Sequence, residues 1–104
     1  MIAESTCGLN FKTQQLLNSI FLKYPQIDEI ILYGSRAKGN FKVGSDIDLT
    51  IKSSSMNLSD LLKIEDDIDN LLLPYKVDLS LMHLIDNDEL IKHIERVGIQ
   101  IYKK

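Results

Sequence analysis

The chain has 104 residues, of which 44% are hydrophobic and 26% charged, an ordinary composition for a globular protein, so we assign residues 1–104 to a single domain. Fifteen acidic residues outnumber twelve basic ones and give a formal net charge of −3, which argues against direct binding to nucleic acid, because phosphates require a basic surface. No apolar run approaches the roughly 18 residues that span a bilayer, and no secretory signal is visible. Cys7 has no second cysteine with which to form a disulfide and is expected in a loose N-terminal segment. We therefore expect a cytoplasmic protein without membrane association.

The first half of the chain predicts one helix and two short strands. Apolar residues recur at helical spacing from Leu9 to Tyr24, and Pro25 ends this helix. The segment Ile27 to Tyr33 contains a β-branched apolar run, which predicts a buried strand that stops at Gly34. A second strand is predicted from about Asp46 to Ile51.

The next two elements are a helix and a strand. Apolar residues fall on one side of a helix from Leu58 to Leu72, and Asn57 is its predicted N-cap. Pro74 then breaks the chain. Lys76 to Leu81 alternates between polar and apolar residues, which predicts a third strand.

The C-terminal part predicts a third helix from Asp88 to Val97, capped by Asp86 and ended by Gly98 in a left-handed conformation. A short strand from Ile99 to Tyr102 follows. Strands that alternate with helices of ten or more residues predict an α/β fold, here an α+β two-layer sandwich with helices on a mixed sheet of about four strands.

Carboxylates gather on the predicted strand that begins at Asp46. Side chains alternate along a strand, so Asp46, Asp48 and Thr50 share one face, while the intervening apolar residues face the other way. Two neighbouring carboxylates repel each other unless a cation lies between them. Mg²⁺ prefers oxygen ligands and leaves room for substrate phosphates. The pair therefore suits two metal ions about 3.5–4 Å apart, the arrangement used for in-line displacement at phosphorus.

The third strand carries one further acid. Asp78 stands between Val77 and Leu79, so a carboxylate is placed among apolar neighbours. If this strand lies beside the second strand, Asp78 falls near the other two acids. It could then hold a metal ion or accept the proton of an attacking hydroxyl.

A candidate phosphate site follows the first strand. Gly34 lets the backbone approach a phosphate closely, and Ser35 opens a predicted turn or short helix. Backbone N–H groups and the Ser35 hydroxyl together could bind an anion. Arg36 and Lys38 could add positive charge without being an obvious necessity.

The order of these residues resembles a known family, the polymerase-beta-like nucleotidyltransferases, and in particular its minimal "MNT" branch. The family motif reads Gly-Ser, a spacer, and then Ser-Asp-x-Asp-Leu. Here it runs from Gly34 to Ile51, and the third acid matches in Val77-Asp78-Leu79. The resemblance implies a polymerase-beta palm-like fold over nearly the whole chain. It also assigns the triphosphate to Gly34, Ser35 and Ser45, and two Mg²⁺ ions to the catalytic acids Asp46, Asp48 and Asp78.

The resemblance also implies an activity and a partner. The expected reaction transfers a nucleoside monophosphate, AMP from ATP, to a hydroxyl acceptor. Minimal members are commonly encoded beside a helical HEPN protein, so we expect an antitoxin that modifies a tyrosine of a HEPN-type toxin. Two alternatives stay open: a non-catalytic antitoxin that blocks its partner by contact, and an aminoglycoside-type transferase acting on a small molecule. A homo- or hetero-oligomer would suit any of them.

Other reactive side chains have simpler interpretations. His93 is expected on the solvated side of the third helix, and nothing supports a site role for His83. Tyr33 is expected to pack beneath the phosphate turn. The sequence leaves Phe41 and Tyr75 ambiguous between packing and nucleotide contact.

Overall fold

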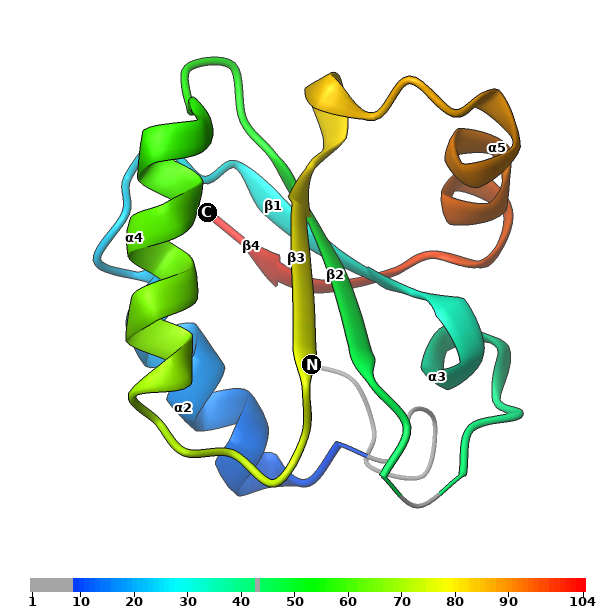
Figure 1. The fold of residues 1–104 in the computed structure, drawn as a ribbon, viewed down its shortest axis with the longest axis horizontal. Coiled ribbons are helices and arrows are strands. Elements are labelled where there is room, and N and C mark those ends of the chain that lie inside the picture. The colour runs from blue at the N-terminus through cyan, green and yellow to red at the C-terminus, as the bar shows by residue number, and fades with distance from the viewer. Residues whose placement is uncertain (1–8, 43) are drawn as a thin grey trace.

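The computed structural model describes residues 9–42 and 44–104, so Cys7 lies outside the described residues. A four-stranded sheet with the strand order β3-β2-β1-β4 forms its centre (Figure 1). In chain order the described elements are α2 (Phe11–Phe21), β1 (Glu29–Tyr33), α3 (Gly34–Lys38), β2 (Ile47–Lys52), α4 (Leu58–Asp69), β3 (Val77–Leu81), the 3₁₀ turn η1 (Met82–Leu84), α5 (Asp88–Val97) and β4 (Ile99–Lys103).

The sheet is mixed, as the sequence predicts. Strand β1 pairs antiparallel with both β2 and β4, whereas β2 and β3 run parallel. Helix α4 makes the connection between the two parallel strands, which cannot be joined by a tight turn. Strands β2 and β1 are therefore central, and β3 and β4 form the two edges.

One face of the sheet carries the main core. Helices α2 and α4 lie on this face, while α3 and α5 lie toward the other (Figure 1). Residues at every second position of β1 and β2 are fully buried beneath α2 and α4: Ile30, Leu32, Ile47, Leu49 and Ile51. The helix residues Leu17, Phe21 and Ile64 fill the same cluster. This layer of helices on a sheet confirms the predicted two-layer α+β fold.

The helices on the core face are shorter than predicted. Helix α2 begins after Asn10, whose side chain accepts a hydrogen bond from the Thr13 N–H, and ends at Phe21. Helix α4 ends at Asp69, and the positive φ of 54° at Leu72 shows that the helix does not extend to that residue. Its predicted N-cap Asn57 is confirmed, and Asp60 completes a capping box.

Helix α5 has the predicted bounds and ends at Gly98 as predicted, but its predicted N-cap and the predicted conformation of Gly98 are wrong. Its N-cap is Asn87, whose side chain accepts a hydrogen bond from the Leu90 N–H, and not Asp86. Gly98 has φ −59°, not a left-handed conformation. Glycine is needed there for space, since an added Cβ would lie 2.4 Å from the Ile94 carbonyl oxygen and 2.6 Å from Ile31 Cγ2. Within the described ranges, every helix is too short or too polar to cross a membrane.

Candidate active site

Two of the three predicted acids, Asp48 and Asp78, lie side by side at one end of the two parallel strands. Asp48 of β2 and Asp78 of β3 are register partners, so their side chains leave the same face of the sheet side by side. Asp46 lies just before β2 and is exposed, whereas Asp48 is half-buried. The sequence prediction that strand pairing brings Asp78 beside Asp48 is thus confirmed. Asp46 precedes the strand instead of opening it.

The charges around Asp48 are not balanced by an ion pair. Burial raises the pKa of Asp48 above its ordinary 3.8, and the negative charges of Asp78 and Asp46 raise it further. Lys76, and His93 when protonated, act in the opposite direction. The salt bridges found among the described residues lie elsewhere and join Lys23 to Asp67 and Lys52 to Glu29. A cation at the carboxylates would therefore relieve a repulsion that the fold leaves in place.

The turn after β1 lies directly against this carboxylate. Gly34 has φ +78°, and an added Cβ would fall 2.3 Å from Asp48 Oδ2. No side chain other than hydrogen fits there, which explains the glycine physically. The short helix α3 continues from it, with Ser35 half-buried at its second position. The predicted phosphate turn and the predicted metal-binding acids are thus in direct contact.

His93 belongs to the site, and its predicted solvated position is wrong. Its Nε2 accepts a hydrogen bond of 3.1 Å from the Gly34 N–H. Its ring also meets Tyr33 edge-to-face, with 6.2 Å between the ring centroids. A signal was present in the sequence, because His93 falls on the same helical stripe as Leu90, Ile94 and Val97. That stripe faces β1 and α3.

Arg36 braces the segment between the turn and the acids. Only 2% of it is exposed, and its Nε and Nη2 donate to the Ser45 carbonyl oxygen at 3.2 and 3.0 Å. Its guanidinium lies 5.2 Å from the Phe41 ring centroid and 4.9 Å from that of Tyr75. Both aromatic residues therefore pack against a cation. The sequence did not mark Arg36 as necessary, but its side chain holds Ser45, Phe41 and Tyr75 together.

Ser45 is tied into this segment through its side chain as well. Its Oγ accepts a hydrogen bond of 2.8 Å from the Lys42 N–H. The residue is half-buried and directly precedes Asp46. Its predicted contact with a nucleotide stays a prediction, and its visible role is to shape the loop that carries the acids.

The polar face continues beyond the acids. Thr50 is fully buried, and the Ser80 hydroxyl donates to its Oγ1 at 2.9 Å. Tyr33 lies on the same face, next to Asp48 in register. Burial is the main cause that raises the pKa of its phenol; the negative charges of Asp48 and Asp78 act in the same direction, and a hydrogen bond with Ser80 opposes them. Tyr33 therefore packs against the carboxylates as well as against His93.

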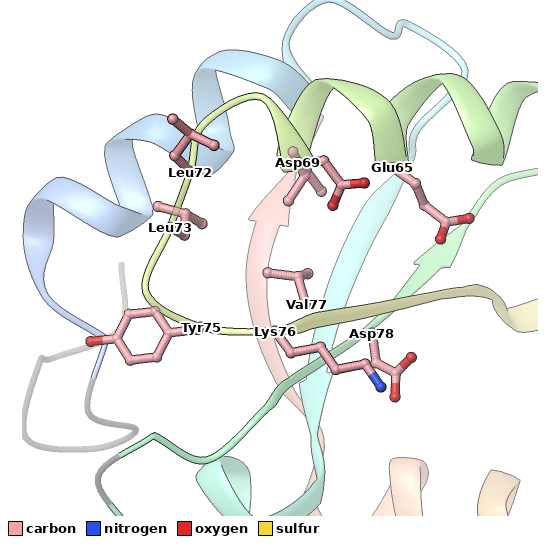
Figure 2. A pocket seen from close by; sticks show the side chains of 9 residues that line it. Glu65, Asp69, Leu72, Leu73, Tyr75, Lys76, Val77 and Asp78 are labelled. Atoms are coloured by element: carbon pink, nitrogen blue, oxygen red, sulfur yellow. The ribbon is translucent and has the colours of Figure 1, made fainter.

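A cavity of about 410 Å³ opens beside Asp78, between α4 and the edge strand β3. Figure 2 shows Glu65 and Asp69 reaching from α4 toward this space, with Lys76 and Asp78 on its other side. The rest of its wall is apolar or aromatic: Ile68, Leu72, Leu73, Tyr75 and Val77. The charged part of the lining therefore consists of three acids, including Asp78, and one lysine.

The donor atoms suit magnesium by type. Within the described ranges, no three His, Cys, Asp or Glu side chains are gathered as a preformed metal cluster. Mg²⁺ is often held by one or two carboxylates and takes its other ligands from water and substrate phosphates. The paired Asp48 and Asp78 supply such oxygens, with Asp46 near enough to affect the pKa of Asp48. The number of ions stays a prediction.

Sequence comparison identifies the family. The family model described as "Polymerase beta, Nucleotidyltransferase" matches residues 15–104, which include both the turn and all three acids. The chain belongs to the polymerase beta nucleotidyltransferase family. Membership confirms the resemblance seen in the motif from Gly34 to Ile51. A comparison with the curated proteins finds no match.

Solved structures show the same fold. A toxin–antitoxin crystal structure with AMP-PNP has a TM-score of 0.71 at 18% identity, over 88% of this chain and 73% of that one. A tri-AMPylated Shewanella oneidensis HEPN toxin in complex with MNT antitoxin gives 0.60 at 20% identity, with coverage of 88% and 73%. A putative nucleotidyltransferase from Sulfolobus solfataricus gives 0.57 at 21% identity, over 88% of this chain and 77% of that one. The likeness confirms the nucleotidyltransferase fold.

Proposed function

We propose that this protein transfers AMP from ATP to a hydroxyl group, that the acceptor is a tyrosine of a HEPN-type partner, and that the modification makes the protein an antitoxin. One observation carries the proposal: the Gly34 turn is packed directly against the Asp48 carboxylate, with Asp78 beside it. A phosphate held by the turn would lie next to the acids. Membership in the nucleotidyltransferase family supports the reaction class.

The proposal gives each residue of the site a role. Ser35 and Ser45 would bind the triphosphate, and Gly34 would let the backbone approach it closely. Asp46, Asp48 and Asp78 would hold two Mg²⁺ ions. Bound Mg²⁺ neutralises the charge that develops on the phosphates during in-line displacement. The acceptor oxygen would form a bond to the α-phosphorus as the bond to pyrophosphate breaks, and Asp78 would accept the hydroxyl proton.

The cavity lies at the edge of the sheet next to Asp78, and it would receive a part of the partner close to the acceptor hydroxyl. Its lining includes Glu65 and Asp69 with Lys76 as its cation, so it favours an acceptor that carries positive charge nearby. A tyrosine of a basic partner protein meets that requirement. Similar solved structures contain toxin–antitoxin pairs, and one of them contains an AMPylated HEPN toxin, which supports a partner of this kind.

A contact antitoxin is the second candidate. Helix α4 presents Asp66 and Asp69 to solvent, and the whole chain carries a net charge of −3. Such a surface could bind a basic RNA-cutting partner without any chemistry. The two candidates differ in one respect: transfer requires the carboxylates of Asp46 and Asp48, whereas contact inhibition does not.

Nucleotide binding is the first test. ATP and GTP are titrated calorimetrically with and without Mg²⁺ into the wild type and into the double variant Asp46→Asn, Asp48→Asn. The matched control is Asp86→Asn, Asp88→Asn, which removes two exposed acids at the same spacing away from the turn. We expect Mg²⁺-dependent ATP binding in the wild type and the control and a loss in the double variant. Equal binding by all three proteins would contradict the assigned site.

Transfer is the second test. Each protein is co-expressed with the HEPN-type protein encoded beside its gene, and the mass of that partner is measured. The wild type and the Asp86, Asp88 control should add the mass of AMP to a tyrosine and restore growth. If the Asp46, Asp48 double variant restores growth without any mass change, the protein works by contact and the transferase proposal fails.

A further inference from the structure

Helix α5 lies next to the Gly34 turn, although the two are far apart in the sequence. It packs against both β1 and α3. Its buried Ile94 and the tight junction at Gly98, which leaves no room for a Cβ against Ile31, fix its position on the sheet. One side chain of α5, that of His93, extends from this fixed support to the backbone of the turn.

The contact is a specific hydrogen bond. The Gly34 N–H donates to His93 Nε2 at 3.1 Å. In this contact Nε2 of the imidazole serves as the acceptor for the backbone N–H. The edge-to-face contact with Tyr33 holds the ring plane at 81° to the phenol. The contact with Tyr33 therefore helps to keep His93 Nε2 directed at the Gly34 N–H.

The turn needs such an acceptor because glycine does not fix its own conformation. Gly34 has φ +78°, one of several backbone regions that glycine visits freely. Rotation of the Tyr33–Gly34 peptide would move the turn relative to Asp48, which lies within contact distance of Gly34. A hydrogen bond to this N–H selects one orientation.

We propose that His93 is a positioning residue for nucleotide binding: by accepting the Gly34 N–H it holds the phosphate turn in register with Asp48. His93 need not touch the nucleotide for this role. The inference rests on the proposed function of the turn, and it adds a residue outside the family motif at Gly34 to Ile51.

The hydrogen bond can be observed directly by NMR. The chain has only five glycines, and Gly34 is the only glycine that follows a tyrosine. Labelling with ¹⁵N-glycine and carbonyl-¹³C-tyrosine therefore identifies its amide signal without full assignment. The variants are His93→Leu, which removes the acceptor, and His93→Gln, which retains an acceptor oxygen. Lys92→Leu, at an exposed neighbouring position of α5, is the control.

In His93→Leu we expect the Gly34 amide signal to shift and its hydrogen exchange to accelerate about tenfold, the ratio that corresponds to ~1.4 kcal/mol. The affinity for Mg²⁺-ATP should fall about as much, while the melting temperature stays near that of the wild type. His93→Gln should recover most of both losses, and Lys92→Leu should show neither. If His93→Leu does not fold, His93→Ala takes its place as the acceptor-free variant.

The outcomes separate the two proposals. An unchanged Gly34 amide in the acceptor-free variant overturns the inference, and so does faster exchange with unchanged ATP affinity, which would leave His93 a packing role alone. Failure of the wild type to bind Mg²⁺-ATP overturns the proposed function and, with it, the inference. Wild-type binding with the expected loss and its recovery in His93→Gln supports both.

Discussion

The two faces of the central sheet show how one strand serves stability and chemistry at once. On the core face of β2, Ile47, Leu49 and Ile51 are completely buried. On the opposite face, Asp48 stands beside Asp78 and beneath the Gly34 turn. Because side chains alternate, packing of the apolar residues fixes where the acid points. The direction of the Asp48 carboxylate is thus set by buried residues on the opposite face of the strand.

The two faces also differ in their effect on stability. The apolar side chains lose contact with water and stabilise the fold. The acids are held near like charges, and the pKa of Asp48 is raised as a result. Such a site destabilises the free protein until a cation or ligand arrives. Substitutions on the two faces should therefore have opposite consequences.

The largest expected effect is the loss of transfer in Asp48→Asn. If Asp48 binds metal as proposed, removal of its carboxylate should lower the rate by on the order of 10³-fold, comparable to the loss of one electrostatic contact to a transition state. Folding should be unharmed, since no described ion pair is broken. Rates of AMP transfer and urea unfolding curves are measured together. A variant that transfers AMP at the wild-type rate would contradict the assignment.

The pH dependence of the stability of Asp48→Asn tests whether the charge of Asp48 destabilises the wild-type protein. A raised folded-state pKa means that the native protein keeps its proton more readily than the unfolded chain. This contribution to stability is present below the ordinary value of 3.8 and is lost as pH rises through the raised pKa of Asp48. Without Mg²⁺, the stability of Asp48→Asn relative to the wild type should therefore increase across that window and then level off. A pH-independent difference would exclude charge as the cause.

The next largest effect is expected on the core face. Leu49→Ala leaves a cavity beneath α2 and α4 and should lower the free energy of unfolding by about 2–5 kcal/mol. Leu62→Ala is the control, since Leu62 is 62% exposed and its loss should change stability little. Urea unfolding measures both. At a temperature where Leu49→Ala is still folded, its Mg²⁺-ATP affinity should remain close to that of the wild type.

Arg36 lies between these two extremes, because it is buried but belongs to the site. Arg36→Lys keeps the charge and loses the flat, forked group that contacts Ser45 and two rings. We expect a loss of about 1–3 kcal/mol in unfolding free energy and weaker ATP binding. Lys38→Ala, at an exposed position of the same helix, should change neither. Full stability in Arg36→Lys would show that charge alone is sufficient.

The smallest effect is expected at Tyr24, near the ends of α2 and α4. Its hydroxyl donates to Asp67, and this bond is the main cause that raises the pKa of Tyr24 from 10.0 to about 12. The contribution to stability is present below pH 10 and is lost as pH rises to about 12. Tyr24→Phe should therefore lower the melting temperature slightly, and the difference should vanish at high pH. Asp67→Asn serves as the comparison.

Much of this arrangement could be predicted because its causes are local. Helical spacing, strand alternation and the break at Pro25 indicate the order of helices and strands. The motif places Gly34 and Asp48 in one site, and the structure brings them into contact. Asp78 was placed correctly because two parallel strands with a helix between them commonly lie side by side.

The missed features depend on contacts between distant segments. His93 meets Gly34 across 59 positions, and periodicity alone cannot say what a helix faces. Arg36 is buried because Phe41 and Tyr75 both reach it, and Tyr75 comes from the other half of the chain. Gly98 has the sequence signature of a left-handed helix end, yet close packing against Ile31 explains it.

The antiparallel pairing of β1 with β4 determines when the site can fold during translation. Strand β1 lies early in the chain and β4 at residues 99–103, with α5 just before it. Pairings between segments so far apart in sequence form slowly, because a long loop must close first. A nascent chain on the ribosome already holds Asp46, Asp48 and Asp78 before α5 and β4 emerge, but not the support for the Gly34 turn. Translation thus completes the motif well before folding can assemble the site.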